Sequence, residues 1–223
     1  MSASDALEIA WLSLKVSATS TLAILVPGVA LGYLLARARF RGKAVLRACV
    51  MLPMVLPPVA VGLVLLTLLA DDGLIGRVLV PLVGGSILLT WWAAAAASAV
   101  MSFPLLVLGA QQGFDAVPRR LEHVAAALGA GPRRVFLRVT LPLALRGILY
   151  GVVFAFARGL GEFGATTLVA GHVPGRTETL SLAIFARIEA FEDGAAWGLA
   201  LVSAVMALSI TVAAEVFLRE ARR

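Results

Sequence analysis

Residues 117–145 read VPRRLEHVAAALGAGPRRVFLRVTLPLAL. Pro118 suits the first position of a helix and Gly129 suits its end, which leaves about eleven residues, or roughly 16 Å of helix. Apolar residues recur at i, i+3, i+4 and i+7 along one face: Leu121, Val124, Ala125 and Leu128. Polar residues cover much of the remaining surface: Arg119, Arg120, Glu122 and His123. The spacing predicts a short amphipathic helix.

The composition around this stretch predicts an integral membrane protein. The chain has 223 residues, of which 61% are hydrophobic and only 14% are charged, and its mean hydropathy is +0.97. These values lie far outside the usual balance of a soluble globular domain. No polar stretch is long enough to form a second, soluble unit, so we expect residues 1–223 to form one transmembrane domain.

The apolar segments on either side have the length of membrane-spanning helices, which need roughly 20 mostly apolar residues. Uncharged segments of this length occupy residues 16–36, 48–70, 86–111 and 194–214. A further segment begins near Leu141 and is interrupted by charged residues at positions 146, 158 and 162. We therefore expect an all-α fold with about five crossings. Residues 179–191 should form a short helix that lies at the outer surface or is partly inserted.

Basic residues predict the orientation of the chain in the membrane. They cluster in residues 37–47, 119–138 and 219–223, and such clusters flank cytoplasmic ends of membrane helices. We expect the N-terminus outside, the C-terminus in the cytoplasm and the amphipathic helix at the cytoplasmic face. The net charge of +6 is explained by these clusters, so membrane lipid is the expected contact and no nucleic-acid partner is required.

Glycines are placed where helices pack or break. Residues 159–167 read GLGEFGATT and fit the spacing of a dinucleotide-binding loop, but that motif requires a preceding strand and here follows an apolar helix. Glycines in membrane helices instead allow close packing or a break beside a cavity. The pairs Gly28/Gly32 and Gly147/Gly151 are interpreted as packing within the fold, with a dimer contact as the less favoured alternative. The sequence contains no P-loop and no metal-ligand cluster, so we expect no bound cofactor, no metal and no catalysis by this chain.

Ionisable residues and prolines within apolar segments are the candidates for a transport pathway. Arg158 and Glu162 are four residues apart, and each charge costs about 2.5 to 3.5 kcal/mol to insert into the membrane. They either form a local ion pair that fixes the helix or face a pathway between two copies of the protein. Pro57 and Pro58 should kink the second crossing in its inner half, as part of a gate or as a static bend.

The stretch 117–145 resembles the EAA loop of ABC-importer permeases. Gly129 occupies the place of its glycine, and Leu141–Pro142 that of its distal Leu-Pro. Ala125 matches an alanine of the pattern, whereas the glutamate of the pattern falls on His123 and Glu122 lies one position early, as in the oxyanion branch. The resemblance implies a coupling helix that docks on an ATP-binding subunit. The residues implied in coupling are Arg119, Arg120, Glu122, His123, Ala125, Gly129, Leu141 and Pro142.

Three other stretches resemble molybdate permeases, with sulfate and tungstate permeases similar: residues 52–62, 157–167 and 174–184. The resemblance implies a type I ABC-importer transmembrane domain in a bacterial cytoplasmic membrane, which translocates molybdate by alternating access. It also implies a second permease copy, two ATPase subunits that bind ATP and magnesium, and an extracytoplasmic oxyanion-binding protein that could dock near residues 171–178. Alternatives are a sulfate or tungstate permease, and a self-contained channel or secondary transporter.

Overall fold

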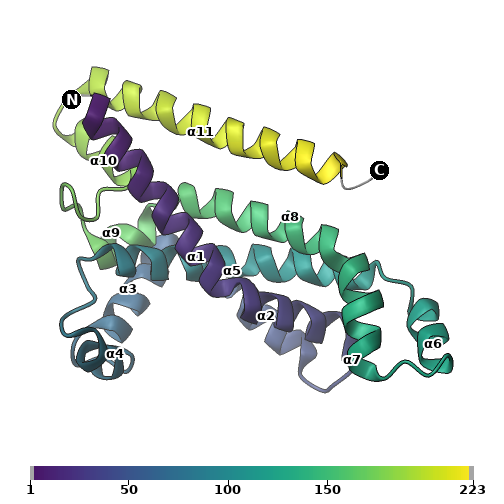
Figure 1. The fold of residues 1–223 in the computed structure, drawn as a ribbon. Helices are drawn as coiled ribbons and strands as arrows, with labels where there is room; N and C mark the ends of the chain where they lie inside the picture. The colour runs from purple at the N-terminus through teal and green to yellow at the C-terminus, as the bar shows by residue number, and fades with distance from the viewer. Residues whose placement is uncertain (1–2, 221–223) are drawn as a thin grey trace.

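The structure, a computed structural model, describes residues 3–220, and no β-strand occurs among these residues (Figure 1). The helices are α1 (Ala3–Arg37), α2 (Lys43–Val55), α3 (Pro58–Leu69), α4 (Gly76–Val83), α5 (Trp91–Asp115), α6 (Arg119–Ala127), α7 (Pro132–Val135), the π-helix η1 (Phe136–Thr140), α8 (Leu141–Leu160), α9 (Gly164–Ala170), α10 (Leu180–Glu189) and α11 (Asp193–Glu220). The predicted all-α fold is confirmed for the described part of the chain.

Helix α5 forms the centre of the molecule, with α1 and α8 packed along it. Its inward-facing side chains are completely buried along the whole helix, from Ala93 through Leu106 and Val107 to Phe114. The small residues Ala93, Ala94 and Ala97 near its first turns allow neighbouring helices to approach closely. Helix α11, by contrast, lies along the outside of the molecule, and only 6% of its apolar window is buried within the chain (Figure 1).

Glycine pairs bring α1, α5 and α8 into close contact. A Cβ atom added to Gly147 would clash with the backbone of Gly113, and one added to Gly109 would clash with that of Gly151. The first helix makes a similar contact, because a Cβ on Gly32 would lie 2.6 Å from the Cβ of Ala110. The prediction that the GxxxG pairs serve packing within the fold is therefore confirmed.

Among residues 3–220, four helices are long and apolar enough to cross a membrane, or up to five if the bent pair α2–α3 counts as one crossing. The segments differ from the predicted ones in their ends. Helix α1 has 35 residues and begins well before residue 16, and its length of about 52 Å exceeds a hydrocarbon core of about 30 Å. Helix α5 begins and ends about one turn later than predicted, because residues 86–90 form a turn before Trp91.

The second predicted crossing, residues 48–70, is not one kinked helix but two helices with a bend of 106° between α2 and α3. Leu56 and Pro57 both have extended backbone, with ψ of 148° and 133°. A proline disfavours helical backbone in the residue before it, so two consecutive prolines force two extended residues in a row. Pro58 then begins α3, where its missing N–H costs nothing. The break falls at Leu56 and Pro57, at the prolines for which the sequence predicted a kink.

The fourth segment is continuous from Pro132 to Leu160 and passes through η1. It ends at Gly161, after which α9 begins a new direction at Gly164. The glycine-rich stretch 159–167 therefore marks a helix break, as one of the two uses of glycine predicted. The short helix expected in residues 179–191 is confirmed as α10. Helices α4 and α9 were not predicted, because each is too short for a recognisable apolar period.

Candidate functional site

Helix α6 ends near the residues that the sequence predicted, but it has nine residues instead of about eleven, and Pro118 precedes the helix instead of occupying its first position. Pro118 is its N-cap, with ψ of 120°, and Gly129 follows its C-cap with φ of +85°. The N–H of Ala130 donates to the carbonyl of Ala125 at 3.1 Å, and the N–H of Gly129 donates to that of Ala126 at 3.0 Å. These two bonds form a Schellman motif, which needs a left-handed residue after the helix and therefore favours glycine there.

Most of the apolar stripe of α6 is left uncovered by the described residues. Leu121 is 39% exposed, Val124 is 53% exposed and Leu128 is 83% exposed, while Ala125 is partly buried. Figure 1 shows α6 at one end of the molecule, apart from the long helices. A stripe of this kind on an amphipathic helix fits a groove on another protein or the surface of a membrane.

Glu122 faces the body of the protein and not the solvent. Its Oε1 atom lies 3.0 Å from Nη2 of Arg37, at the end of α1, and accepts a hydrogen bond of 2.7 Å from the hydroxyl of Thr140 in η1. The same Nη2 atom of Arg37 donates to the carbonyl of Val117 at 3.1 Å. The carboxylate therefore joins three separate elements. The other polar residues of α6, Arg119, Arg120 and His123, are exposed.

The segment that follows α6 leads directly into the membrane. Pro132 occupies the first position of α7, and in η1 the N–H of Leu141 bonds to the carbonyl of Phe136, five residues earlier. Pro142 follows in the first turn of α8, where its missing N–H falls beside this wider turn. Leu141 and Pro142 therefore lie in the helix that enters the membrane, and α6 reaches this helix through a short turn.

Arg158 and Glu162 form the ion pair that one reading of the sequence proposed. Nη1 of Arg158 lies 2.7 Å from Oε2 of Glu162, and the two side chains are 32% and 2% exposed. The other oxygen, Oε1, accepts the backbone N–H of Ala165 at 2.9 Å. One oxygen of Glu162 thus pairs with the charge of Arg158, and the other accepts a backbone N–H in the first turn of α9. A buried carboxylate needs partners of both kinds.

The structure brings the two groups of pathway candidates together. Helix α3, which begins at Pro58, packs against α9, which follows Glu162. A Cβ on Gly164 would lie 2.7 Å from the Cβ of Pro58, and a Cβ on Gly62 would lie 2.9 Å from the Cα of Ala165. Two interrupted membrane segments therefore meet at one place, where irregular backbone must be buried in protein or line a cavity.

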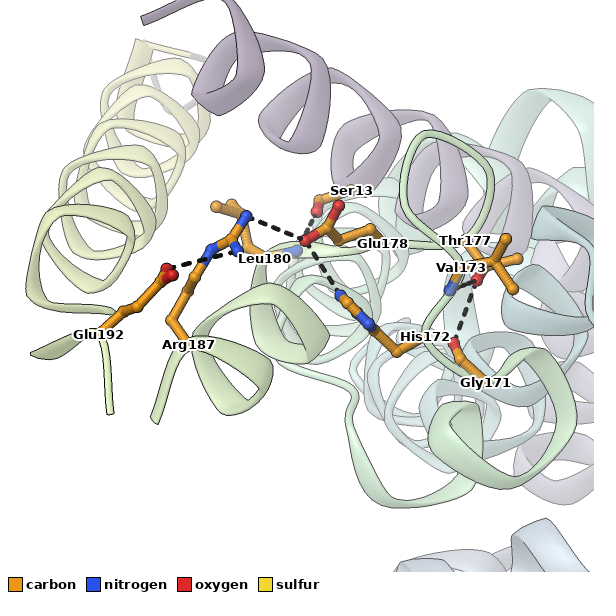
Figure 2. Close-up of polar contacts among 9 residues, drawn as sticks. All are labelled: Ser13, Gly171, His172, Val173, Thr177, Glu178, Leu180, Arg187 and Glu192. Carbon is orange, nitrogen blue, oxygen red and sulfur yellow. Dashed lines mark hydrogen bonds and ion pairs between the residues drawn. The ribbon is translucent and has the colours of Figure 1, made fainter. Parts of the chain in front are cut away.

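At the opposite end from α6, polar contacts fix the segment between α9 and α10 (Figure 2). Oε1 of the buried Glu178 lies 3.0 Å from Nε2 of His172 and 3.8 Å from Nη2 of Arg187, which in turn lies near Glu192. The hydroxyl of Ser13 accepts the N–H of Leu180 at 2.7 Å and ties the segment to α1.

Only part of the predicted docking segment 171–178 is available to a partner. Thr177 is completely buried; its hydroxyl accepts the N–H of Val173 at 2.9 Å and donates to the carbonyl of Gly171 at 3.1 Å. Residues 174–176 remain exposed at the tip of the turn. A cavity of about 440 Å³ opens beside this tip and is lined on the α1 side by Glu8, Trp11 and Lys15.

Several residues of these sites could not be found from the sequence. Arg37 stood in a basic cluster with no sign that it would pair with a residue 85 positions later. Thr140 directly precedes the Leu-Pro element, and nothing in the sequence indicated that its hydroxyl would bond to Glu122. The GxxxG spacing of Gly109 and Gly113 was the one signal that could have been used. Among the described residues, no three His, Cys, Asp or Glu side chains are grouped so that they could hold a metal ion.

Comparisons with known proteins agree with this geometry. The family model described as binding-protein-dependent transport system inner membrane component matches residues 28–223. The molybdenum transport system permease protein ModB of Escherichia coli (strain K12) is 44% identical over 199 residues, which cover 88% of this chain and 86% of that protein. The putative molybdenum transport system permease protein YvgM of Bacillus subtilis (strain 168) is 36% identical over 197 residues, which cover 88% and 87%.

Two solved structures share the fold. A chain of the MetNI methionine ABC transporter in inward-facing conformations matches with a TM-score of 0.78 and 18% identity, and all of both chains is covered. A chain of a bacterial ABC transporter involved in the import of the acidic polysaccharide alginate matches with a TM-score of 0.75 and 16% identity, covering 99% of this chain and 80% of that one. At these identities the likeness concerns the fold alone.

Proposed function

The chain belongs to the binding-protein-dependent transport system inner membrane components, and from this premise we propose that it is the membrane-spanning subunit of an ATP-driven ABC importer of molybdate. One observation supports the proposal most directly. Over 88% of the chain, 44% of the residues are identical to those of a protein named for molybdenum transport. Relatives in Bacillus subtilis and Haemophilus influenzae, which are also named for molybdenum transport, support the same cargo.

The subunit performs no chemistry of its own in this proposal. ATP and magnesium bind to two separate ATPase subunits, and α6 is the surface on which they act. The exposed apolar stripe of α6, with Val124 and Leu128 uncovered, supports this assignment, because such a stripe on a short helix fits a groove on a partner. Arg119, Arg120 and His123 lie exposed on the same helix and complete the docking surface.

A second copy of the chain and an extracytoplasmic binding protein complete the assembly that we propose. The N-terminus lies outside and the C-terminus in the cytoplasm, which places α6 and its basic neighbours inside and the turn 174–176 outside, where a binding protein delivers the anion. Residues 221–223 of the C-terminal basic cluster lie outside the described part of the chain.

The anion passes between the two copies beside the interrupted segments. Arg158 supplies positive potential there, and Glu162 weakens the binding of a dianion. Weak binding is needed because an ion that binds too tightly cannot leave the pathway. The contact between Pro58 and Gly164 supports this location, because it places the break after α2 against the break after α8. Movement of α6 switches the pathway between inward-open and outward-open states.

Reconstitution in liposomes tests the proposal. The chain is purified with the ATPase and the binding protein encoded beside it, and uptake of molybdate, tungstate and sulfate is measured with and without ATP. We expect ATP-dependent uptake with molybdate preferred. A preference for sulfate would contradict the assignment of molybdate as the cargo. Uptake by the chain alone without ATP would contradict the assignment as an importer subunit and would favour a channel or secondary transporter.

A further inference from the structure

We propose that Glu122, Arg37 and Thr140 form a positioning cluster, called here the Glu122 cluster, that transmits movement of α6 to α1 and α8 at the same time. The inference rests on the proposed function, since it requires a separate motor that displaces α6. It assigns a role to Arg37 and Thr140 and gives Glu122 an internal role in place of a contact with the motor.

In the Glu122 cluster, two side chains donate hydrogen bonds to the same acceptor atom. One carboxylate oxygen, Oε1 of Glu122, receives both the guanidinium of Arg37 at 3.0 Å and the hydroxyl of Thr140 at 2.7 Å. The side chains of Arg37 and Glu122 are 13% and 20% exposed, and Thr140 is 2% exposed. Charge-assisted bonds in such a shielded place hold their geometry better than an ion pair on an open surface.

The cluster matters because α6 has few other attachments. The structure describes α6 in full, and no residue of this helix is buried. Besides Glu122, the side chain of Arg119 reaches the body of the protein, with a long contact of 3.5 Å to the carbonyl of Arg37. Apart from the bond between Glu122 and Thr140, these polar attachments of α6 lead to Arg37, at the last turn of α1.

Each partner of Glu122 lies where a displacement would be passed into the membrane. Arg37 also donates a hydrogen bond to the carbonyl of Val117, which lies just before α6. The end of α1 is therefore bonded to the start of α6 at Val117 and at Glu122. Thr140 closes η1, and the wider hydrogen bond from Leu141 to Phe136 directly precedes α8. Single π-turns inside α-helices are frequently found at functional sites. A displacement of Glu122 thus acts on α1 and on the start of α8 together.

The test uses the complete transporter in liposomes and measures the number of anions imported per ATP hydrolysed. The single variants are Glu122→Gln, Arg37→Gln and Thr140→Val, and the double variant combines Glu122→Gln with Arg37→Gln. Thr140→Ser keeps the hydroxyl and should restore coupling. Arg41→Gln is the matched control, because Arg41 is exposed and lies just beyond α1 in the same basic segment. Copurification of the ATPase shows that each variant folds and assembles.

We expect each single variant to assemble normally, to hydrolyse ATP and to import at least about fivefold fewer anions per ATP, which is the lower end of typical coupling between sites. The double variant should be no worse than the worse single variant, because the two residues act through one contact. Unchanged import per ATP in the single variants would overturn the inference.

Two further outcomes are also decisive. If Glu122→Gln alone loses the ATPase while Arg37→Gln and Thr140→Val behave like the unaltered protein, Glu122 contacts the motor directly and the cluster has no role in coupling. If the effects of Glu122→Gln and Arg37→Gln multiply, the two residues act independently, which also contradicts the inference. Failure of the unaltered complex to import any anion with ATP would instead count against the proposed function.

Discussion

Gly129 shows how a single backbone angle can fix the place of a functional helix. Its φ of +85° is costly for residues with a side chain, and no atom lies within 4 Å of the position that a Cβ would take. Any loss of stability on substitution therefore comes from the strained backbone angle and not from a steric clash. The glycine was identified from the sequence because helix ends and glycine are linked by local geometry alone.

Gly129→Ala should reduce anion uptake several-fold and leave the protein in the membrane. An L-residue in the left-handed conformation costs roughly 1–2 kcal/mol, which shifts the end of α6 and the turn into α7. Gly131→Ala is the control, because Gly131 has φ of −65° and is equally open. Uptake by vesicles from cells expressing each variant is the measurement. Equal uptake by the two variants would show that the end of α6 is not critical.

Variants of Arg158 and Glu162 distinguish a contribution of this ion pair to stability from a contribution to transport. Arg158→Gln leaves the nearly buried carboxylate without its ion pair and should lower the free energy of unfolding by up to about 3 kcal/mol, at the low end for a buried pair. The loss stays at that end because the Arg158 side chain is 32% exposed. Thermal unfolding of the purified protein measures this loss.

The double variant Arg158→Gln/Glu162→Gln removes both charges and keeps an oxygen that can accept the N–H of Ala165. It should therefore recover most of the stability but still import slowly, because the positive potential of the pathway is lost. If the double variant imports at the normal rate, the pair serves the fold alone.

At the scale of the helices, contacts between elements explain why some predictions failed. The ends of α6 were predicted well because a proline, a glycine and an apolar period all act locally. The bend of 106° after α2 was predicted only as a kink, since its size depends on the packing of α3 against α9. The early start of α1 was missed because Asp5, Glu8 and Lys15 interrupt its apolar run while the helix continues beyond the membrane.

The crossing of α5 and α8 should be highly sensitive to added atoms. Gly147→Ala places a methyl group against the backbone of Gly113, so we expect a loss of about 1–3 kcal/mol in stability, typical of overpacking. Gly198→Ala in α11 is the control, because no atom lies within 4 Å of its added Cβ, and it should be neutral or slightly stabilising. Thermal unfolding in detergent compares the two, and similar values would contradict the packing described here.

The apolar stripe of α6 should decide whether the ATPase binds. Val124→Asp puts a charge on the stripe, and a charge that must be buried without a partner weakens association strongly. We expect the ATPase to be lost when the complex is purified through this chain. Ala126→Asp adds the same charge to an exposed residue on the opposite face of α6 and should retain the ATPase. Loss of the ATPase with both variants, or with neither, would argue against docking through the stripe.

At the scale of the whole molecule, the sequence predicted the all-α class and the membrane-crossing segments, but not the arrangement of the helices. The sidedness of the chain stays a prediction. Charge and hydropathy report how each segment meets water or lipid, so they predict crossings and orientation. They carry no information about which helix occupies the centre. The central position of α5 depends on glycines in α1, α5 and α8 that meet only after folding. The pairing of Arg37 with Glu122 has the same origin.

The two surfaces that we propose for docking lie at opposite ends of the molecule. The exposed tip 174–176 and the network around Glu178 lie at one end of the long helices, and α6 lies at the other (Figure 1, Figure 2). This separation agrees with the proposed docking of an outer partner at one end and of an ATPase at the other.

The most direct test of the account is the location and partner of α6 in intact cells. In a Cys49→Ala background, Leu128→Cys is treated with a membrane-impermeant thiol reagent and, separately, with a cross-linker, and Arg176→Cys serves as the outer control. The account predicts that position 176 reacts with the external reagent, whereas position 128 does not and cross-links to an ATPase subunit. Reaction of position 128 with the external reagent, or the absence of any cross-link to an ATPase, would contradict it.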